Sequence, residues 1–206
     1  MKLTAEQLQR FEAFLDQIKS ETYPETPHER HEAITQKMMT YLWDKFPPPS
    51  GARVLDVGCG QGVALKHFQD RAVSATGITV NSVDAKACTD KGFNVLEMDQ
   101  SFLDFPDATF DLVWCRHCIE HSIFPYFTLT EFSRVLKPGG LLYLEVPAPD
   151  TSCHHESNRN HYSVLGKSMW IELCKRVGFG ILDGVEIGFT VVPGPDTYWA
   201  IIARRP

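Results

Sequence analysis

The chain has 206 residues, of which 43% are hydrophobic and 22% are charged, and its formal net charge is −6 at pH 7. This composition excludes a largely disordered chain, and the length suits one globular domain with a small appendage. Because the acidic balance provides no overall positive field, we expect no nucleic-acid partner, and small or neutral ligands fit better.

The N-terminal sequence MKLTAEQLQRFEAFLDQ carries charge throughout, unlike a secretion signal. No window approaches the roughly 18 apolar residues of a membrane span, so we expect a cytoplasmic protein that does not bind membranes. Six cysteines are scattered along the chain without the density of a disulfide-stapled domain. We expect them to be reduced thiols.

Two helices are predicted before the first strand. Thr4 and Gln7 form a capping box, and apolar residues then recur at steps of three and four, which predicts a helix over 5–20. A second helix is expected to begin with Thr26 as its N-cap and to end before the prolines at 47–49.

No strand precedes these two helices, so we expect residues 1–49 to form a helical cover, or lid, on a domain over 50–206. Tyr23, His31 and Tyr41 are predicted to contact a ligand from this cover.

From Arg53 onward the pattern alternates between strand and helix, which predicts crossover connections and a largely parallel sheet with helices on both faces. The last two strands are separated only by the turn sequence VPGPD, so we expect an antiparallel hairpin at the sheet edge. The predicted strands are 53–57, 72–79, 93–98, 109–115, 141–146, 180–188 and 197–203, and the predicted helices among them are 62–70, 82–91, 125–136 and 164–177.

Residues 54–62 read VLDVGCGQG, a buried-type strand followed by a turn with three glycines. In open α/β sheets the first strand-to-helix turn brings bare backbone close to a nucleotide, and glycine permits that approach. A purely structural turn is the alternative. The spacing G-x-G-x-G places Val63 where a dinucleotide fingerprint has its third glycine, so a dehydrogenase is the weaker interpretation. A P-loop is excluded because its G-x-x-x-x-G-K-[ST] pattern does not occur.

Three ordered motifs carry a resemblance to a known family. VLDVGCGQG, FPDATFDLVWCRHCIEH (105–121) and RVLKPGGLLYLEVP (134–147) are similar to signatures of the class I S-adenosylmethionine-dependent methyltransferases, most like their broad small-molecule group. The likeness covers about residues 50–206. It implies an α/β fold with a Rossmann-like, doubly wound, seven-stranded sheet, mostly parallel with an antiparallel last strand. It also implies S-adenosylmethionine as cofactor, with S-adenosylhomocysteine as product.

The resemblance implies a cofactor site at the carboxyl ends of the first four strands. Family members usually have an acid at the tip of the second strand for the ribose hydroxyls, where this chain has Thr79, which binds without charge assistance. The implied residues are Asp56, Gly58, Cys59 and Gly60 for the amino-acid part of the cofactor, Thr79 and Asn81 for the ribose, Asp99 and Gln100 for the adenine, and Cys115, Arg116 and His117 for the methionine end.

Methyl transfer from a sulfonium is accelerated largely by alignment, and a base is needed only if the acceptor must lose a proton. We identify His117, His155 and His161 as candidates for that base, because they follow strands near the expected cofactor site. The alternatives are packing of His117 against the cofactor and ordinary loop polarity for the other two.

The spacing Cys115-x-x-Cys118, together with Cys153-His154-His155-Glu156 in a loop at the same sheet edge, would also suit zinc. We predict no metal, because Cys115 ends a strand where the cofactor should sit and no second C-x-x-C occurs. His121 is expected to be a packed residue.

The leading hypothesis is therefore a methyltransferase acting on an O or N atom of a small-molecule or glycan-like acceptor. The alternatives are a peptide or protein methyltransferase and a non-catalytic module that senses S-adenosylmethionine or its product. The presence of Thr79 keeps the last of these open.

Overall fold

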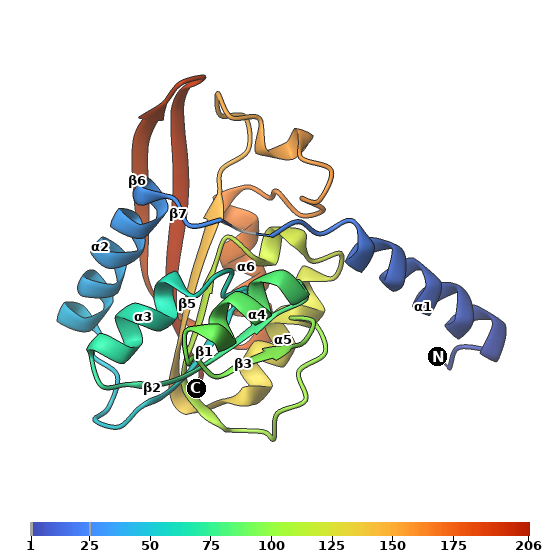
Figure 1. The fold of residues 1–206 in the computed structure, drawn as a ribbon, viewed down its shortest axis with the longest axis horizontal. Helices are drawn as coiled ribbons and strands as arrows, with labels where there is room; N and C mark the ends of the chain where they lie inside the picture. The colour runs from blue at the N-terminus through green and yellow to red at the C-terminus, as the bar shows by residue number, and fades with distance from the viewer. Residues whose placement is uncertain (1, 25) are drawn as a thin grey trace.

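The computed structural model describes residues 2–24 and 26–206, and those residues form one seven-stranded sheet (Figure 1). The strands are β1 (Arg53–Val57), β2 (Ser74–Thr79), β3 (Val95–Glu97), β4 (Phe110–Arg116), β5 (Leu136–Pro147), β6 (Gly180–Val191) and β7 (Gly194–Arg204). Their order in the sheet is β3-β2-β1-β4-β5-β7-β6. The first five pair in parallel, whereas β7 pairs antiparallel with both β5 and β6. The predicted fold class and the terminal hairpin are confirmed.

The helices cover both faces of this sheet. One face packs against α5 and α6, and the other against α2 and α3. None of the helices in the described ranges is long and apolar enough to cross a membrane. The helices are α1 (Ala5–Ser20), α2 (Glu29–Lys45), α3 (Val63–Asp70), α4 (Ser82–Asp90), α5 (Pro125–Val135) and α6 (Lys167–Val177), with short 3-10 helices η1 (Ile119–His121) and η2 (His155–Ser157).

The start of α2 differs from the prediction. His28, not Thr26, is the N-cap, and its Nδ1 accepts a hydrogen bond from the backbone N–H of Arg30 at 3.2 Å. Pro27 disfavours helical backbone in the residue before it, and the buried stripe of α2 begins only at Ile34. No packing therefore holds a turn that starts two residues earlier.

Several other boundaries also differ from the prediction, among them the hairpin turn, where β6 runs to Val191 and β7 begins at Gly194, and the starts of β5 and α6. β5 begins at Leu136 instead of residue 141, because Leu136 already pairs with Phe110 before an irregularity that ends where Leu141 pairs with Leu112. α6 begins at Lys167 instead of residue 164, because Gly166 is extended at its N-cap.

The two N-terminal helices differ in how they join the body. Helix α2 buries Met38, Met39 and Leu42 against the sheet, so it forms a layer of the core. In α1, by contrast, none of the residues 5–20 is buried, and Figure 1 shows this helix extending away from the body. The ring of Phe11 meets that of Phe124 at 5.6 Å between centroids.

Candidate active site

The strand order reverses between β1 and β4, which is the position where open α/β sheets bind ligands. Two cavities lie there. The first, of about 1070 Å³ including its open mouth, is bounded by the loops after β1, β2 and β3 and by Leu15 and Ile18 of α1. The second, of about 1130 Å³ measured in the same way, lies among histidines and includes Asp56 and Arg116. The two share part of their walls, namely Tyr23, Gly58, Gly60, His117 and His121.

The glycine turn after β1 supplies space at this junction. Gly58 has a φ of +70°, and a Cβ built on it would lie 2.5 Å from Cys118 Sγ and 2.6 Å from Cys118 Cβ. Any side chain at this position is therefore both strained and blocked. The backbone N–H groups of Gly58 and Cys59 already donate to the carbonyl of Ile78, each at 3.0 Å, so these two N–H groups anchor the turn to β2.

Asp56, at the end of β1, is buried and lines the second cavity. Burial raises its pKa to about 8, with the Cys88 thiol acting in the same direction and Arg116 in the opposite one. Its Oδ2 has no hydrogen-bond partner within residues 2–24 and 26–206. A cationic ligand group beside this carboxyl would favour its charged form.

Thr79 and Asn81 line the first cavity, but their side-chain oxygens have backbone donors. Thr79 Oγ1 accepts from the backbone N–H of Asn81 at 3.1 Å, and Asn81 Oδ1 caps α4 by accepting from the N–H groups of Val83 and Asp84. Asp84, in the first turn of α4, is itself buried and lines the same cavity. Asp84 was not identified from the sequence, because an acid in a helix's first turn usually serves only the helix dipole.

The predicted adenine contacts follow β3 and also line the first cavity. Asp99 Oδ1 accepts from the backbone N–H of Ser101 at 2.7 Å, and Gln100 Nε2 donates to the carbonyl of Cys118 at 2.9 Å. Both loops are thereby fixed, and the exposed carboxylate of Asp99 retains a second oxygen for a ligand.

Of the cysteines considered for zinc, Cys153 lies with His155 and Asp196 in a group of three potential metal ligands, but the C-x-x-C pair does not join it. Cys115 is 0% exposed, belongs to the core and lines neither cavity, so the structure does not bring it to the methionine end. In the described part of the chain, neither Cys115 nor Cys118 belongs to a group of three potential metal ligands. The side chain of His154 is 72% exposed.

Buried charges surround His117 at the end of β4. Its Nε2 lies 3.2 Å from Glu145 Oε1, and its Nδ1 lies 3.3 Å from Glu120 Oε1. Burial opposes a charge on His117, but the nearby carboxylates of Glu120 and Glu145 outweigh it and raise the pKa of this histidine. Arg116 Nε lies 2.8 Å from Glu145 Oε1, and Tyr143 donates its hydroxyl to the other oxygen of that carboxylate. His117 is thus held rigidly between the two cavities.

His155 and His161 reach the second cavity from the loop after β5. His155 Nε2 lies 3.0 and 3.1 Å from the two carboxylate oxygens of Asp196, which is buried on β7. Burial lowers the pKa of His161 to about 4. No sequence motif marks Asp196 as a partner of His155, because it lies 41 residues further along the chain, on β7.

Two of the three residues that the N-terminal segment was expected to contribute line a cavity, and the third does not. Tyr23 lines both cavities and His31 lines the second, where burial lowers the pKa of His31 to about 4. Tyr41 lines neither cavity and instead donates a 2.6 Å hydrogen bond to Asp183. Its place on α2 turns it toward β6.

Comparisons with known proteins agree with this architecture. A family model described as a methyltransferase domain matches residues 27–184. A 27-O-demethylrifamycin SV methyltransferase of Amycolatopsis mediterranei is 30% identical over 156 residues, or 68% of this chain and 57% of that protein. An O-methyltransferase of Pyrenophora dematioidea is 28% identical over 180 residues, or 80% and 67%. The chain thus spans little more than half of the first relative and about two thirds of the second.

Solved structures share the fold at low sequence identity. The [4+2]-cyclase SpnF has a TM-score of 0.72 at 20% identity, covering 98% of this chain and 96% of its own. An S-adenosylmethionine-dependent methyltransferase from Archaeoglobus fulgidus has a TM-score of 0.66 at 22% identity, covering 82% and 94%. The family model therefore carries the assignment and confirms the resemblance seen in the sequence motifs. The chain belongs to the methyltransferase-domain family of the class I, S-adenosylmethionine-dependent type.

Proposed function

We propose that this protein transfers a methyl group from S-adenosylmethionine to an oxygen atom of a small-molecule acceptor. The observation that carries the proposal is the common wall of two cavities at the strand-order reversal, formed in part by Gly58, Gly60 and His117. One cavity would hold the nucleoside and the other the acceptor, so that the sulfonium methyl lies at their junction. Alignment of this kind supplies much of the rate of an in-line displacement.

The residues of the first cavity suit the nucleoside. Asp99 would accept a hydrogen bond from the adenine amino group, with Gln100 beside it. We assign the ribose hydroxyls to Asp84, because it is a buried carboxylate in the wall that also contains Thr79 and Asn81. Thr79 and Asn81 then serve mainly to fix the N-terminus of α4, which brings Asp84 into place.

The methionine end would extend into the second cavity. The cofactor's ammonium group can pair with Asp56, whose Oδ2 has no protein partner among the described residues. Arg116, whose Nη2 is likewise unpartnered there, can bind the cofactor carboxylate. Cys59 lines this cavity too, but its side chain is buried and close to Cys88, which restricts it to packing.

Of the three predicted catalytic histidines, His155 has the geometry of a general base, because Asp196 holds its Nε2 and leaves Nδ1 for a substrate. In the proposed step, an acceptor O–H gives its proton to His155 Nδ1 while the oxygen attacks the methyl carbon. The S–CH3 bond breaks, its electron pair stays on sulfur, and S-adenosylhomocysteine is released. His117 would orient both reactants from the shared wall.

Relatives that act on oxygen favour an O-acceptor, since 27-O-demethylrifamycin SV methyltransferase and the O-methyltransferase of Pyrenophora dematioidea are named for it. We also propose a cytoplasmic location, because the free state of the cysteines in this structure suits a reducing compartment.

Calorimetry with S-adenosylmethionine and S-adenosylhomocysteine, followed by a labelled-methyl assay over phenols, polyols, carboxylic acids, amines, glycans and peptides, tests the proposal. We expect both nucleosides to bind and label to appear in a hydroxylated small molecule. Label in a peptide would show that the acceptor is a peptide or protein and not a small molecule. Binding of both nucleosides without transfer to any acceptor would favour a sensing module.

A further inference from the structure

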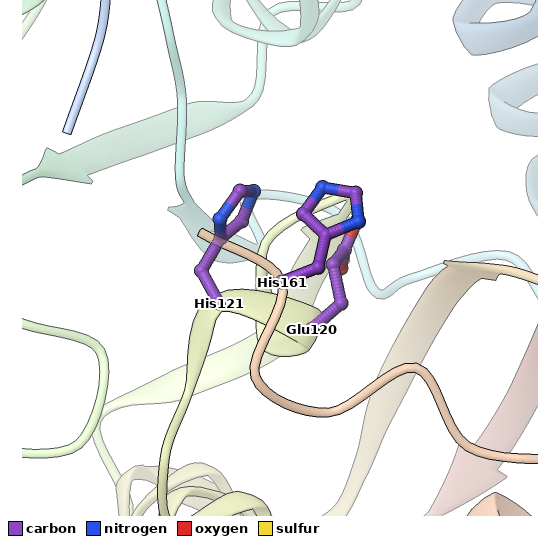
Figure 2. Close-up of side chains that lie close together, drawn as sticks. All are labelled: Glu120, His121 and His161. Atoms are coloured by element: carbon purple, nitrogen blue, oxygen red, sulfur yellow. The ribbon is translucent and has the colours of Figure 1, made fainter. Parts of the chain in front are cut away.

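A second cluster of polar side chains stands in the second cavity, apart from the His155–Asp196 pair. Glu120 and His121 lie on η1, which follows β4, and His161 approaches from the loop before α6 (Figure 2). Each offers one ligand atom, and these atoms lie within 4.8 Å of one another. The rings of His121 and His161 meet nearly at right angles, with 4.7 Å between centroids.

The hydrogen bonds around this cluster leave open the nitrogen and oxygen atoms that could bind a metal ion. Glu120 is 1% exposed, and neither of its carboxylate oxygens has a hydrogen-bond partner in the described ranges, although His117 Nδ1 lies 3.3 Å from Oε1. His117 faces this buried carboxylate from one side only, so a second cation on the side of His121 and His161 would further offset the cost of burying it.

Both imidazoles are held from outside the cluster. His121 Nδ1 lies 2.8 Å from the carbonyl oxygen of Asn160, so Nδ1 carries the proton and donates it. Nε2 therefore keeps its lone pair, and a backbone carbonyl behind one ring nitrogen is the usual support of a metal-binding histidine. The His161 ring has a hydrogen bond to the backbone of His155, whereas its Nδ1 has no partner within residues 2–24 and 26–206.

We propose that Glu120, His121 and His161 bind a divalent transition-metal ion. In tetrahedral coordination, two donors at about 2.1 Å from an ion lie about 3.4 Å apart, so the three ligand atoms, now within 4.8 Å of one another, would close by up to about 1.4 Å around an ion. Two imidazoles and one carboxylate favour Zn²⁺, Co²⁺, Fe²⁺ or Mn²⁺ over Mg²⁺ and Ca²⁺, which prefer oxygen ligands throughout. Three protein ligands leave coordination positions open to the cavity.

The neighbouring group formed by Cys153, His155 and Asp196 is less suited to a metal, although its ligand atoms also lie close together. There the carboxylate of Asp196 already has both His155 and Cys153 as hydrogen-bond partners. In this group the potential ligand atoms form hydrogen bonds with one another, whereas those of Glu120, His121 and His161 do not.

This site deepens the proposed function and rests on it for its role. The ion would take the acceptor oxygen as a further ligand and hold it near the junction with the first cavity, because His121 lines both cavities. A hydroxyl bound to a dication is also more acidic than a free one, which eases loss of its proton to His155. Acceptors with adjacent oxygen atoms, which can chelate, are then the expected class.

Titration of the metal-free protein with CoCl2, followed by visible absorption, tests the metal site without any methyl transfer. We expect about one Co²⁺ per chain with ligand-field bands, displaced by ZnCl2. His161→Gln and Glu120→Gln should each weaken Co²⁺ binding by at least about tenfold. His154→Gln, which removes an exposed histidine from the same loop, should bind Co²⁺ as the unmodified protein does. Circular dichroism shows whether each variant is folded. If Glu120→Gln unfolds, the result for His161→Gln, which changes only a loop residue, decides the test.

The absence of ligand-field bands at millimolar CoCl2, or bands that persist in His161→Gln, would overturn the site. Its role is tested separately with an acceptor identified in the labelled-methyl assay. Removal of metal by a chelator should lower methyl transfer at least about tenfold, with recovery on adding metal. An equal rate of methyl transfer before and after chelation would show that the ion does not bind the acceptor for the reaction. Metal binding without transfer to any acceptor would overturn the proposed function and leave the site in place.

Discussion

His155 Nε2 lies 3.0 Å from Asp196 Oδ1, so a histidine of an irregular loop is held by a buried carboxylate of strand β7. The backbone N–H of Thr197 also donates to Asp196 Oδ1, at 2.9 Å, which fixes the carboxylate in turn. The sheet thus fixes the orientation of His155, although this residue lies in a loop. Orientation by a third group is what distinguishes a general base from a solvated imidazole.

Replacing His155 with asparagine should reduce methyl transfer by about 100-fold or more, because the proton of the acceptor loses its receiver. The affinity for S-adenosylhomocysteine should stay within about twofold, since the first cavity is untouched. Single-turnover rates and calorimetry measure the two quantities. Cys153→Ala is the matched control, because it leaves the His155–Asp196 pair in place. An equal loss of affinity and rate would assign His155 to cofactor binding.

Asp56 should make the stability of the protein depend on pH. Burial raises its pKa from 3.8 to about 8, so the stability that the protonated carboxyl contributes is complete below about pH 4 and is lost as the pH rises through 8. Asp56→Asn cannot ionise, so its free energy of unfolding should fall less over this range. Urea denaturation at pH 5 and pH 8 compares the two proteins. Identical pH dependence would show that Asp56 is already charged at pH 5.

Gly58→Ala should destabilise the protein by about 1–3 kcal/mol, since the added methyl group meets Cys118 and the backbone has a positive φ. A second change, Cys118→Gly, removes both atoms of the clash and should recover part of the loss in the double variant. Thermal and urea unfolding of the single and double variants give the coupling. Additive effects would mean that the turn moves away from Cys118 at little cost.

Asp84→Asn should weaken binding of S-adenosylhomocysteine by about tenfold, because a charge-assisted hydrogen bond to the ribose becomes a neutral one. The decisive comparison uses an analogue that lacks the ribose 2′-hydroxyl, measured by calorimetry on both proteins. We expect the variant to lose less affinity for this analogue than for the natural nucleoside. Equal losses for the two ligands would place Asp84 away from the 2′-hydroxyl.

The sequence predicts the sheet and the chain order of its elements, because these follow from local patterns. The run VLDVGCGQG identifies a buried strand and a glycine turn without knowledge of any distant contact. The side on which Cys115 points could not be predicted in the same way. Four consecutive residues of β4, including Cys115, are buried on one face or the other, so the sequence offers no polar alternation that would distinguish them.

The polar partners of the site were beyond prediction for a different reason. Glu145 on β5 and Asp196 on β7 meet His117 and His155 only through the packing of strands, and nothing near them in the sequence marks a ligand site. Glu120 and His121 belong to a motif that the sequence does show. Their relation to His161 depends on a loop whose path follows from tertiary contacts, such as the hydrogen bond from Ser163 to the carbonyl of Ser122.

Helix α1, which buries none of residues 5–20, bears on how fast a reaction cycle can end. The segment behind it is tied to the histidine-bearing loop by 2.9 Å and 3.1 Å hydrogen bonds, from Asn160 to the carbonyl of Glu21 and from Asn158 to the hydroxyl of Tyr23. A helix that buries none of its residues can detach while the sheet stays intact. We expect the detachment of α1 to govern the escape of the spent nucleoside, and with it the steady-state rate, and the amides of α1 should be the first to exchange with deuterium.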